Sequence, residues 1–158
     1  MSNRPRKDEY YMGIAKAVAQ RSTCLKRKYG AVIVNNDEII ATGYNGNPRG
    51  AKNCCDTGVC IRLDKPHNSG DYSDCESVHA EQNAMISASR RDMIGAKLYL
   101  YGEEAKSHEY QGDKIIGTTF EEIKYPEPCP ICKRMIINSG IDEIISSDGD
   151  GFFISTIL

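Results

Sequence analysis

The sequence is organised around two short motifs, His79-Ala80-Glu81 and Pro128-Cys129-Pro130-Ile131-Cys132, which are separated by the segment 82–127. Their side chains include one imidazole, two thiols and a carboxylate two residues after the imidazole. A catalytic zinc ion needs three protein ligands, an open fourth position for water and a proton carrier that is not itself a ligand. The motifs therefore predict that His79, Cys129 and Cys132 hold Zn²⁺ and that Glu81 carries protons.

Each motif is expected at the start of a helix. Ser77 is a candidate N-cap of a helix that carries His79 and Glu81 in its first turn. Two cysteines three residues apart share one face of a helix, and a helix N-terminus favours their thiolate form. Glu81 follows His79 by two residues, so it points in another direction, toward the bound water and the substrate. We expect the two helices to lie side by side on a sheet with their N-termini together.

Each motif alone has a simpler interpretation. An isolated H-x-E is more often a helix-start pair without function, and an isolated C-x-x-C is often a structural zinc ligand pair or a redox pair. The conjunction of the two motifs, both at helix starts, favours a catalytic zinc site. A free carboxylate also argues against a purely structural site, which needs four ligands.

The remaining patterns alternate between helix and strand. The loop 45–77 is rich in Gly, Pro and Cys. A loop of this length is expected to be functional or to be held together by cross-links, which its cysteines could supply. The tail 147–158 fits an edge strand or an oligomer contact. The expected elements are a helix over 8–21, a hairpin of strands over 29–34 and 38–44, a helix over 77–91, a strand over 96–101, a helix from Pro128 that ends at Gly140, and a strand over 142–146.

Composition limits the class of protein. The 158 residues fit a single domain over 1–158, and a net charge of -2 gives no general attraction to nucleic acid or to an anionic membrane. No run of apolar residues is long enough to span a bilayer, and no signal peptide is visible. Seven cysteines in such a chain favour metal binding over disulfides, and we expect a cytoplasmic protein without membrane or nucleic-acid partners.

The residues around the motifs narrow the class further. The pairing of H-x-E with P-C-x-x-C is the signature of zinc deaminases. Five stretches together closely resemble the deoxycytidylate (dCMP) deaminases of the cytidine deaminase-like superfamily: Ser22–Lys28, Gly30–Val34, Thr42–Gly46, His79–Ala84, and Pro128–Cys132 with Ile136–Ile141. The resemblance covers most of the chain from Arg21 to Ile145.

The resemblance implies a fold and an activity. It implies an α/β fold, a three-layer α/β/α sandwich on a mixed sheet of roughly five strands. It also implies hydrolysis of dCMP to dUMP with release of ammonia, feeding thymidylate synthesis, in a homo-oligomer, often a hexamer, regulated by dCTP and dTTP. The residue that matches Asn45 contacts the nucleotide's sugar in that family, and the backbone at Ala80 helps to hold the pyrimidine.

A basic cluster precedes the first strand. Lys26, Arg27 and Lys28, together with Arg49, are candidates to bind a 5′-phosphate, and the alternative is a run of solvated charges. Arg90 matches a subunit-contact position in a relative, although its spacing also fits a plain exposed helical arginine.

Further cysteines remain in and before the long loop. Several members of the family carry a second, structural zinc ion, and the match assigns Cys24, Cys54, Cys60 and Cys75 to such a site here. Cys55 is an alternative to Cys54, and His67 lies nearby in the sequence. The other interpretation is a set of buried free cysteines that act as small apolar residues.

The segment 102–127 departs from the family pattern. In the relatives, the strand that matches Leu98–Leu100 is followed almost directly by the Pro-Cys motif, whereas here a charged insertion intervenes. It is a candidate lid, substrate-selecting element or subunit contact. Alternative activities are deamination of tRNA adenosine, of guanine or of another free cytosine nucleotide, and the non-enzymatic alternative is a zinc-stabilised assembly module.

Overall fold

A mixed sheet of six strands forms the centre of the computed structural model, which describes residues 3–69 and 73–158. The strand order is β2-β1-β3-β5-β6, and β4 pairs with β3 beyond the end of β5. Only β3 and β5 run parallel. The strands are β1 Arg27–Asn35, β2 Glu38–Tyr44, β3 Lys97–Gln111, β4 Lys114–Glu122, β5 Glu143–Ser147 and β6 Phe153–Ile157; the helices are α1 Lys7–Ala19, α2 Cys54–Thr57, α3 Ala80–Ile86, α4 Arg90–Met93 and α5 Pro130–Ser139.

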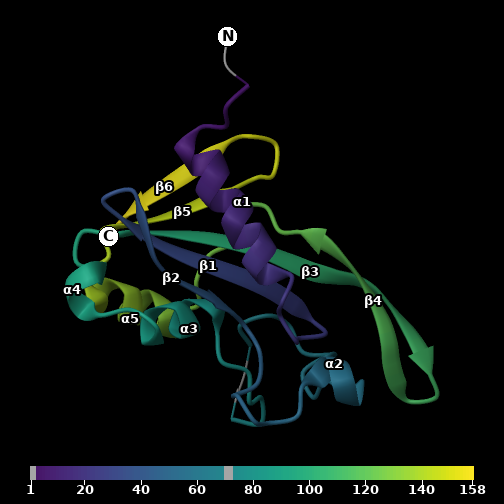
Figure 1. Cartoon of the computed structure of the whole chain (residues 1–158). Helices are drawn as coiled ribbons and strands as arrows, with labels where there is room; N and C mark the ends of the chain where they lie inside the picture. The colour runs from purple at the N-terminus through teal and green to yellow at the C-terminus, as the bar shows by residue number, and fades with distance from the viewer. Residues whose placement is uncertain (1–2, 70–72) are drawn as a thin grey trace.

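The sheet has an apolar core on each face, which makes three layers (Figure 1). Side chains alternate along a strand, so Ala31 and Ile33 of β1 pack against α3 and α5, whereas Val32 and Val34 pack against α1. The same alternation divides β3. This arrangement confirms the predicted three-layer α/β/α sandwich.

Two glycines let the helices lie close to the sheet. A Cβ on Gly30 of β1 would lie 2.0 Å from the carbonyl oxygen of Ala15 in α1, and one on Gly43 of β2 would lie 2.3 Å from that of Ala80 in α3. Helix α3 also presents a thin alanine face to the sheet, with Ala84 fully buried. The start of α3, which carries the first motif, therefore sits directly on β2.

The N-terminal helix and the β1–β2 hairpin follow their sequence patterns. The hairpin turns at Asn36 and Asp37, whose φ angles of 51° and 60° are those of a two-residue turn that suits the twist of the strands. The Tyr11 hydroxyl of α1 donates to the Asp37 carboxylate, which ties the helix to this turn.

The helices that carry the motifs start later than expected. His79, not Ser77, is the N-cap of α3, and Cys129 is the N-cap of α5, which begins at Pro130 instead of Pro128. Gly140 ends α5 at a φ of 93°, as predicted. The single helix expected over 77–91 is instead α3 and α4, because the Ser89 side chain accepts from the backbone N–H of Asp92 and caps a new helix.

The segment 102–127 contains most of the strand content that the sequence did not reveal. Strand β3 continues to Gln111 and turns into β4. The resulting hairpin over 103–122, the arm, extends beyond the body of the sheet (Figure 1). The backbone N–H of Ile115 donates to the carbonyl of Gly58 at 2.9 Å, which attaches this arm to the cysteine-rich loop beside α2. The arm supplies the sixth strand beyond the predicted five.

The C-terminal tail adds the last strand. Strand β6 runs antiparallel to β5 at the edge of the sheet, which matches the first of the two interpretations of this tail. Across the described ranges, the helices are too short or too polar to cross a bilayer.

Candidate metal centre and active site

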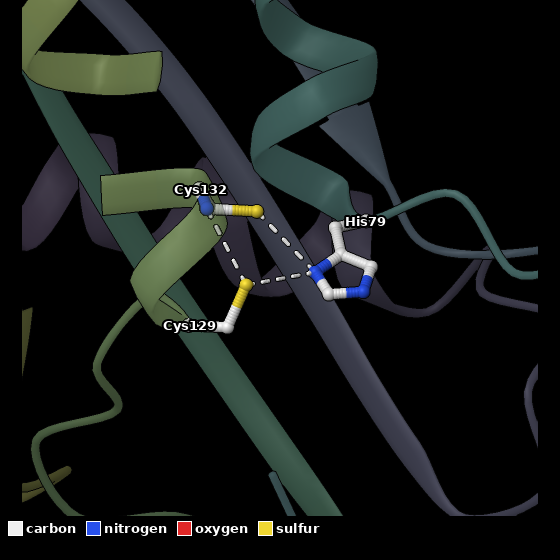
Figure 2. A group of neighbouring side chains, drawn as sticks. All are labelled: His79, Cys129 and Cys132. Carbon is white, nitrogen blue, oxygen red and sulfur yellow. Dashed lines mark hydrogen bonds between the residues drawn. The ribbon is translucent and has the colours of Figure 1, made fainter. Parts of the chain in front are cut away.

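The two motifs meet at the helix starts of α3 and α5 (Figure 2). The Nδ1 atom of His79 lies 3.3 Å from Sγ of Cys132 and 3.5 Å from Sγ of Cys129. All three ligand atoms lie within 4.8 Å of one another, and in the described part of the chain no other group meets that criterion. The structure therefore brings together the three residues that the sequence predicted as ligands.

Two of these ligand residues occupy helix N-caps, where hydrogen bonds orient them. Cys129 occupies the N-cap of α5, where its sulfur accepts from the backbone N–H of Cys132 at 3.4 Å. His79 occupies the N-cap of α3, and its backbone N–H donates to Oε1 of Gln82 at 2.9 Å. Pro130 at the first position of α5 suits a helix start because it has no N–H to leave unpaired.

The chemistry of the three donors fits a zinc ion. Burial lowers the pKa of His79, which keeps the imidazole neutral and its Nδ1 lone pair available. Burial raises the pKa of the Cys132 thiol, and the nearby Glu81 and Cys129 raise it further. A divalent cation offsets this concentration of negative charge, because two thiolates cancel the two charges of Zn²⁺.

Glu81 lies beside the ligand set but is not part of it. Its side chain is only 4% exposed, and burial raises the pKa of its carboxyl. Hydrogen bonds from its own backbone N–H and from the Cys132 side chain oppose that rise in pKa. A buried carboxyl with a raised pKa exchanges protons near neutral pH more readily than an exposed one.

The metal centre borders a hollow of about 140 Å³, whose lining includes His79, Glu81 and Cys129. Asn45 lines its wall and is 6% exposed. The Asn45 side chain accepts from the backbone N–H of Tyr29 at 2.8 Å and donates to the carbonyl of Arg27 at 2.9 Å. Asn45 thus holds the start of β1 in place, and Ala80 is fully buried between the two site residues of α3.

The structure divides the predicted phosphate cluster. The Lys26 ammonium donates to the backbone carbonyls of Arg62, at 2.7 Å, and Lys65, so it fastens the cysteine-rich loop. The Lys28 ammonium lies 4.5 Å from the centre of the Phe120 ring on the arm. Arg27 and Lys26 both line the hollow, whereas Lys28 does not.

Sequence reasoning missed some residues of the hollow. Tyr29 and Glu127 line it. Tyr29 had a usable signal, because it lies two residues after Arg27 on a strand and thus on the same face. No sequence pattern indicated that Glu127 lines the hollow, because its position depends on the path of the chain from the arm to α5.

The candidate residues for a second metal lie near one another, but among the described residues their sulfurs do not meet the 4.8 Å criterion that the catalytic ligands meet. Burial raises the pKa of Cys54, and so does the proximity of Cys24, Cys60 and Cys75. Cys55 is exposed, with its sulfur 3.9 Å from a carboxylate oxygen of Asp56. Cys54 therefore lies with the cluster, whereas Cys55 lies apart from it.

A family comparison matches nearly the whole chain. The model of the cytidine and deoxycytidylate deaminase zinc-binding region matches residues 5–147. The chain belongs to this family. It is 38% identical to a deoxycytidylate deaminase of Mycobacterium phage D29 over 90% of this chain and 95% of the relative. It is 36% identical to a deoxycytidylate deaminase of Schizosaccharomyces pombe over 90% of this chain, but it spans only 37% of that protein.

Solved structures agree with the family and the fold. The dCMP deaminase of cyanophage S-TIM5, solved in complex with dCMP and dUMP, is 26% identical with a TM-score of 0.58 over 90% of this chain and 82% of its own. A cytidine deaminase of Burkholderia pseudomallei shares the fold at 18% identity, with a TM-score of 0.56 over 99% of this chain and 93% of its own.

Proposed function

We propose that this protein is a zinc-dependent dCMP deaminase, which hydrolyses dCMP to dUMP and ammonia and so feeds thymidylate synthesis. One observation carries the proposal: a buried carboxyl, Glu81, lies beside a histidine and two cysteines in a site that borders a hollow. The relative in Mycobacterium phage D29, similar over nearly its full length, is named a deoxycytidylate deaminase, and the S-TIM5 enzyme was solved with dCMP and dUMP.

His79, Cys129 and Cys132 would hold the ion, which when bound lowers the pKa of a water molecule enough to make a nucleophile near neutral pH. Glu81 accepts the proton that this water loses and passes it to ring nitrogen N3 of the pyrimidine. A bond from oxygen to C4 forms, and the bond from C4 to the amine breaks. Glu81 then moves the second proton of the attacking water from the new C4 hydroxyl to the amine, so that a carbonyl remains at C4 and the amine leaves as ammonia.

Asn45 and Ala80 orient the substrate in this proposal. The Asn45 amide keeps one N–H for the sugar after its bonds to the backbone of β1. The backbone at Ala80 faces the pyrimidine from the start of α3 and lies between His79 and Glu81.

Glu81→Gln tests the reaction. The amide keeps the size of the side chain but accepts no proton at neutral pH, so we expect ammonia release from dCMP to fall by at least about 100-fold. Zinc content, measured by elemental analysis, should stay unchanged because Glu81 is not a ligand. Normal turnover by this variant would refute the role of Glu81, and a parallel assay on CMP, dCTP, guanine and tRNA distinguishes the other zinc deaminase activities.

A second, structural zinc ion is part of the proposal. Cys24, Cys54, Cys60 and Cys75 supply four thiolates, which is the closed ligand set of a structural site. The proximity of these thiols supports the assignment. Elemental analysis should find two zinc ions per chain, with one lost in Cys60→Ser and none lost in Cys55→Ser; one ion per wild-type chain contradicts this part.

Assembly and regulation complete the proposal. We infer a cytoplasmic homo-oligomer, with a hexamer favoured and with dCTP and dTTP as effectors. Exposed apolar side chains on α3 and α5, namely Ile86, Ile131 and Met135, support a subunit contact on that layer, and Arg90 at the start of α4 lies on the same side. A cytosolic compartment keeps the thiol ligands reduced. Sedimentation and assays with each triphosphate test these points.

A further inference from the structure

The catalytic hollow continues into a second, larger one. The outer hollow has a volume of about 500 Å³ and lies between the start of β1, the end of the arm and the start of α5. Arg27, Tyr29, His67, Asn68 and Glu127 line both hollows. Small-molecule sites usually have volumes of about 300–1,000 Å³, so the inner hollow alone is smaller than a typical site. A ligand whose base reaches Glu81 therefore extends into the outer hollow.

The outer hollow is lined by charged residues of both signs, and one of its cations, Arg27, is also paired with Glu104 outside the lining. Of its described lining, Arg27 and Lys133 are cations and Glu127 is the carboxylate. His67 adds an N–H donor but no charge near pH 7, because burial and the nearby Arg27 and Lys26 lower the pKa of its imidazole to about 4. An anionic group on the ligand would find two cations here, one from β1 and one from α5.

The other basic residues near the site are directed elsewhere. The Lys26 ammonium is bonded to loop carbonyls, and Lys28 lies over Phe120. Arg49 is exposed in the turn after β2 and lines neither hollow. Among the candidates that the sequence offered for a phosphate, only Arg27 lines the outer hollow, and Lys133 was not among them.

Both cations stand on rigid elements. The Arg27 guanidinium donates to the Tyr29 hydroxyl at 3.0 Å and to a carboxylate oxygen of Glu104 at 3.1 Å, and its side chain is 21% exposed. The backbone N–H of Lys133 donates to the carbonyl of Cys129 at 2.9 Å, in the first turn of α5. Lys133 directly follows the ligand Cys132, so its backbone is fixed relative to the metal centre, and its exposed side chain extends from there into the lining of the outer hollow.

We propose that Lys133, together with Arg27, binds the 5′-phosphate of the substrate and determines the preference of this enzyme for a nucleoside monophosphate over a nucleoside. This inference rests on the proposed function. It assigns the phosphate contact to Lys133 of α5 and to Arg27, one member of the basic run at the start of β1. Glu127, which lines both hollows, then lies at the level of the sugar, whose hydroxyl groups donate hydrogen bonds to a carboxylate.

The test compares dCMP with deoxycytidine, which lacks the phosphate. A charge-assisted contact at this position should make the ratio of kcat/KM for dCMP to kcat/KM for deoxycytidine fall about tenfold in Lys133→Met. Lys133→Arg should restore most of that ratio. Arg134→Met is the matched control, because Arg134 is the next residue of α5, carries the same charge, is exposed and lines neither hollow. An unchanged ratio in Lys133→Met, or an equal fall in Arg134→Met, overturns the assignment.

Binding of the product separates this inference from the proposed function. Calorimetric titration of zinc-loaded protein with dUMP and with deoxyuridine needs no turnover. We expect Lys133→Met to weaken binding of dUMP about tenfold relative to deoxyuridine, with no such change in Arg134→Met. Wild-type protein that binds dUMP with this pattern but releases no ammonia from dCMP refutes the proposed function and leaves the phosphate contact standing. Wild-type protein that does not discriminate dUMP from deoxyuridine overturns the phosphate contact itself.

Discussion

At the scale of the residue, Gly30 shows how closely the helices approach the sheet. The space that its missing side chain leaves is filled by the backbone of α1, with the carbonyl oxygen of Ala15 2.0 Å from an ideal Cβ. Backbone atoms of a packed helix cannot move away as a flexible side chain can, so an added methyl group must displace α1 from β1.

Gly30→Ala should therefore destabilise the protein by about 1–3 kcal/mol. Gly13→Ala is the control, because Gly13 lies inside α1 with no atom within 4 Å of an added Cβ. That control should gain about 0.5–1 kcal/mol, since alanine favours a helix interior over glycine. Urea denaturation of both variants measures the free energy of unfolding, and equal values for the two would contradict the close packing.

The sequence predicted residues whose side chains have a distinctive chemistry, such as zinc ligands. It did not predict the role of a residue when that role depends on where its side chain points in the fold. His79, Cys129 and Cys132 are recognisable because few other side chains bind zinc, and the structure brings them together. The direction of the Lys26 side chain was not predictable, because a lysine has a long stem; its ammonium bonds to the loop carbonyls of Arg62 and Lys65, while Lys26 also lines the inner hollow. Spacing along the chain contains no information about such a direction.

At the scale of the element, the contact between α1 and the β1–β2 turn depends on pH. Hydrogen bonds from Lys7 and Tyr11 lower the pKa of Asp37, and the bond to Asp37 raises the pKa of Tyr11 to about 12. The stabilisation from Asp37 is therefore present above the usual pKa of a carboxyl and is lost as the pH falls through its lowered value. The stabilisation from Tyr11 is present below the usual pKa of a phenol, near 10, and is lost as the pH rises toward 12.

Tyr11→Phe should lower the free energy of unfolding at pH 7 and remove the part of the alkaline loss that falls between pH 10 and 12. Denaturant unfolding across this range measures both effects, and the tyrosinate absorbance should lose one late-titrating group. Tyr10→Phe is the control, because Tyr10 is 51% exposed on the same helix. A variant with the same alkaline profile as the wild type would contradict the contact with Asp37.

Elements with a regular pattern were predictable, and the arm was not. Helix α1 and the β1–β2 hairpin follow apolar periodicity and a turn of Asn and Asp. Most of the arm extends away from the core, so its two faces are mostly exposed, and like charges such as Glu103 and Glu122 lie opposite each other. A strand without a buried face has no alternation of apolar and polar residues for the sequence to display.

At the scale of the whole molecule, the candidate metal centre joins two helices that otherwise meet through few residues. The ligands come from α3 and α5, which pack on the same face of the sheet as separate elements. Because an ion that binds the folded protein stabilises it by mass action, zinc-loaded protein should melt at a higher temperature than chelated protein, by several degrees or more.

Chelation followed by calorimetry measures this difference in melting temperature, and addition of zinc should reverse it. Cys129→Ser is the comparison variant, because a hydroxyl is a much weaker zinc ligand than a thiolate. Its melting temperature should respond little to chelation beyond any effect of the second metal. A wild-type melting temperature that chelation leaves unchanged would contradict metal binding at this site.

The three-layer arrangement of the molecule was predicted mainly from the resemblance of its motifs to a known family, and less from the periodicity of apolar residues. The three-layer fold follows from the match of motifs, and the family comparison agrees with it over residues 5–147. The order of the strands and the presence of a sixth strand could not be predicted from the motifs. Pairing between distant segments depends on contacts that no local sequence pattern records.

The two helix caps at the metal centre also bear on how the ligands keep their orientation. Hydrogen bonds orient the N-cap residues His79 and Cys129 at the starts of α3 and α5. The ligand geometry is therefore partly an outcome of helix capping, so a change at a capping partner such as Gln82 would alter the metal centre without touching a ligand.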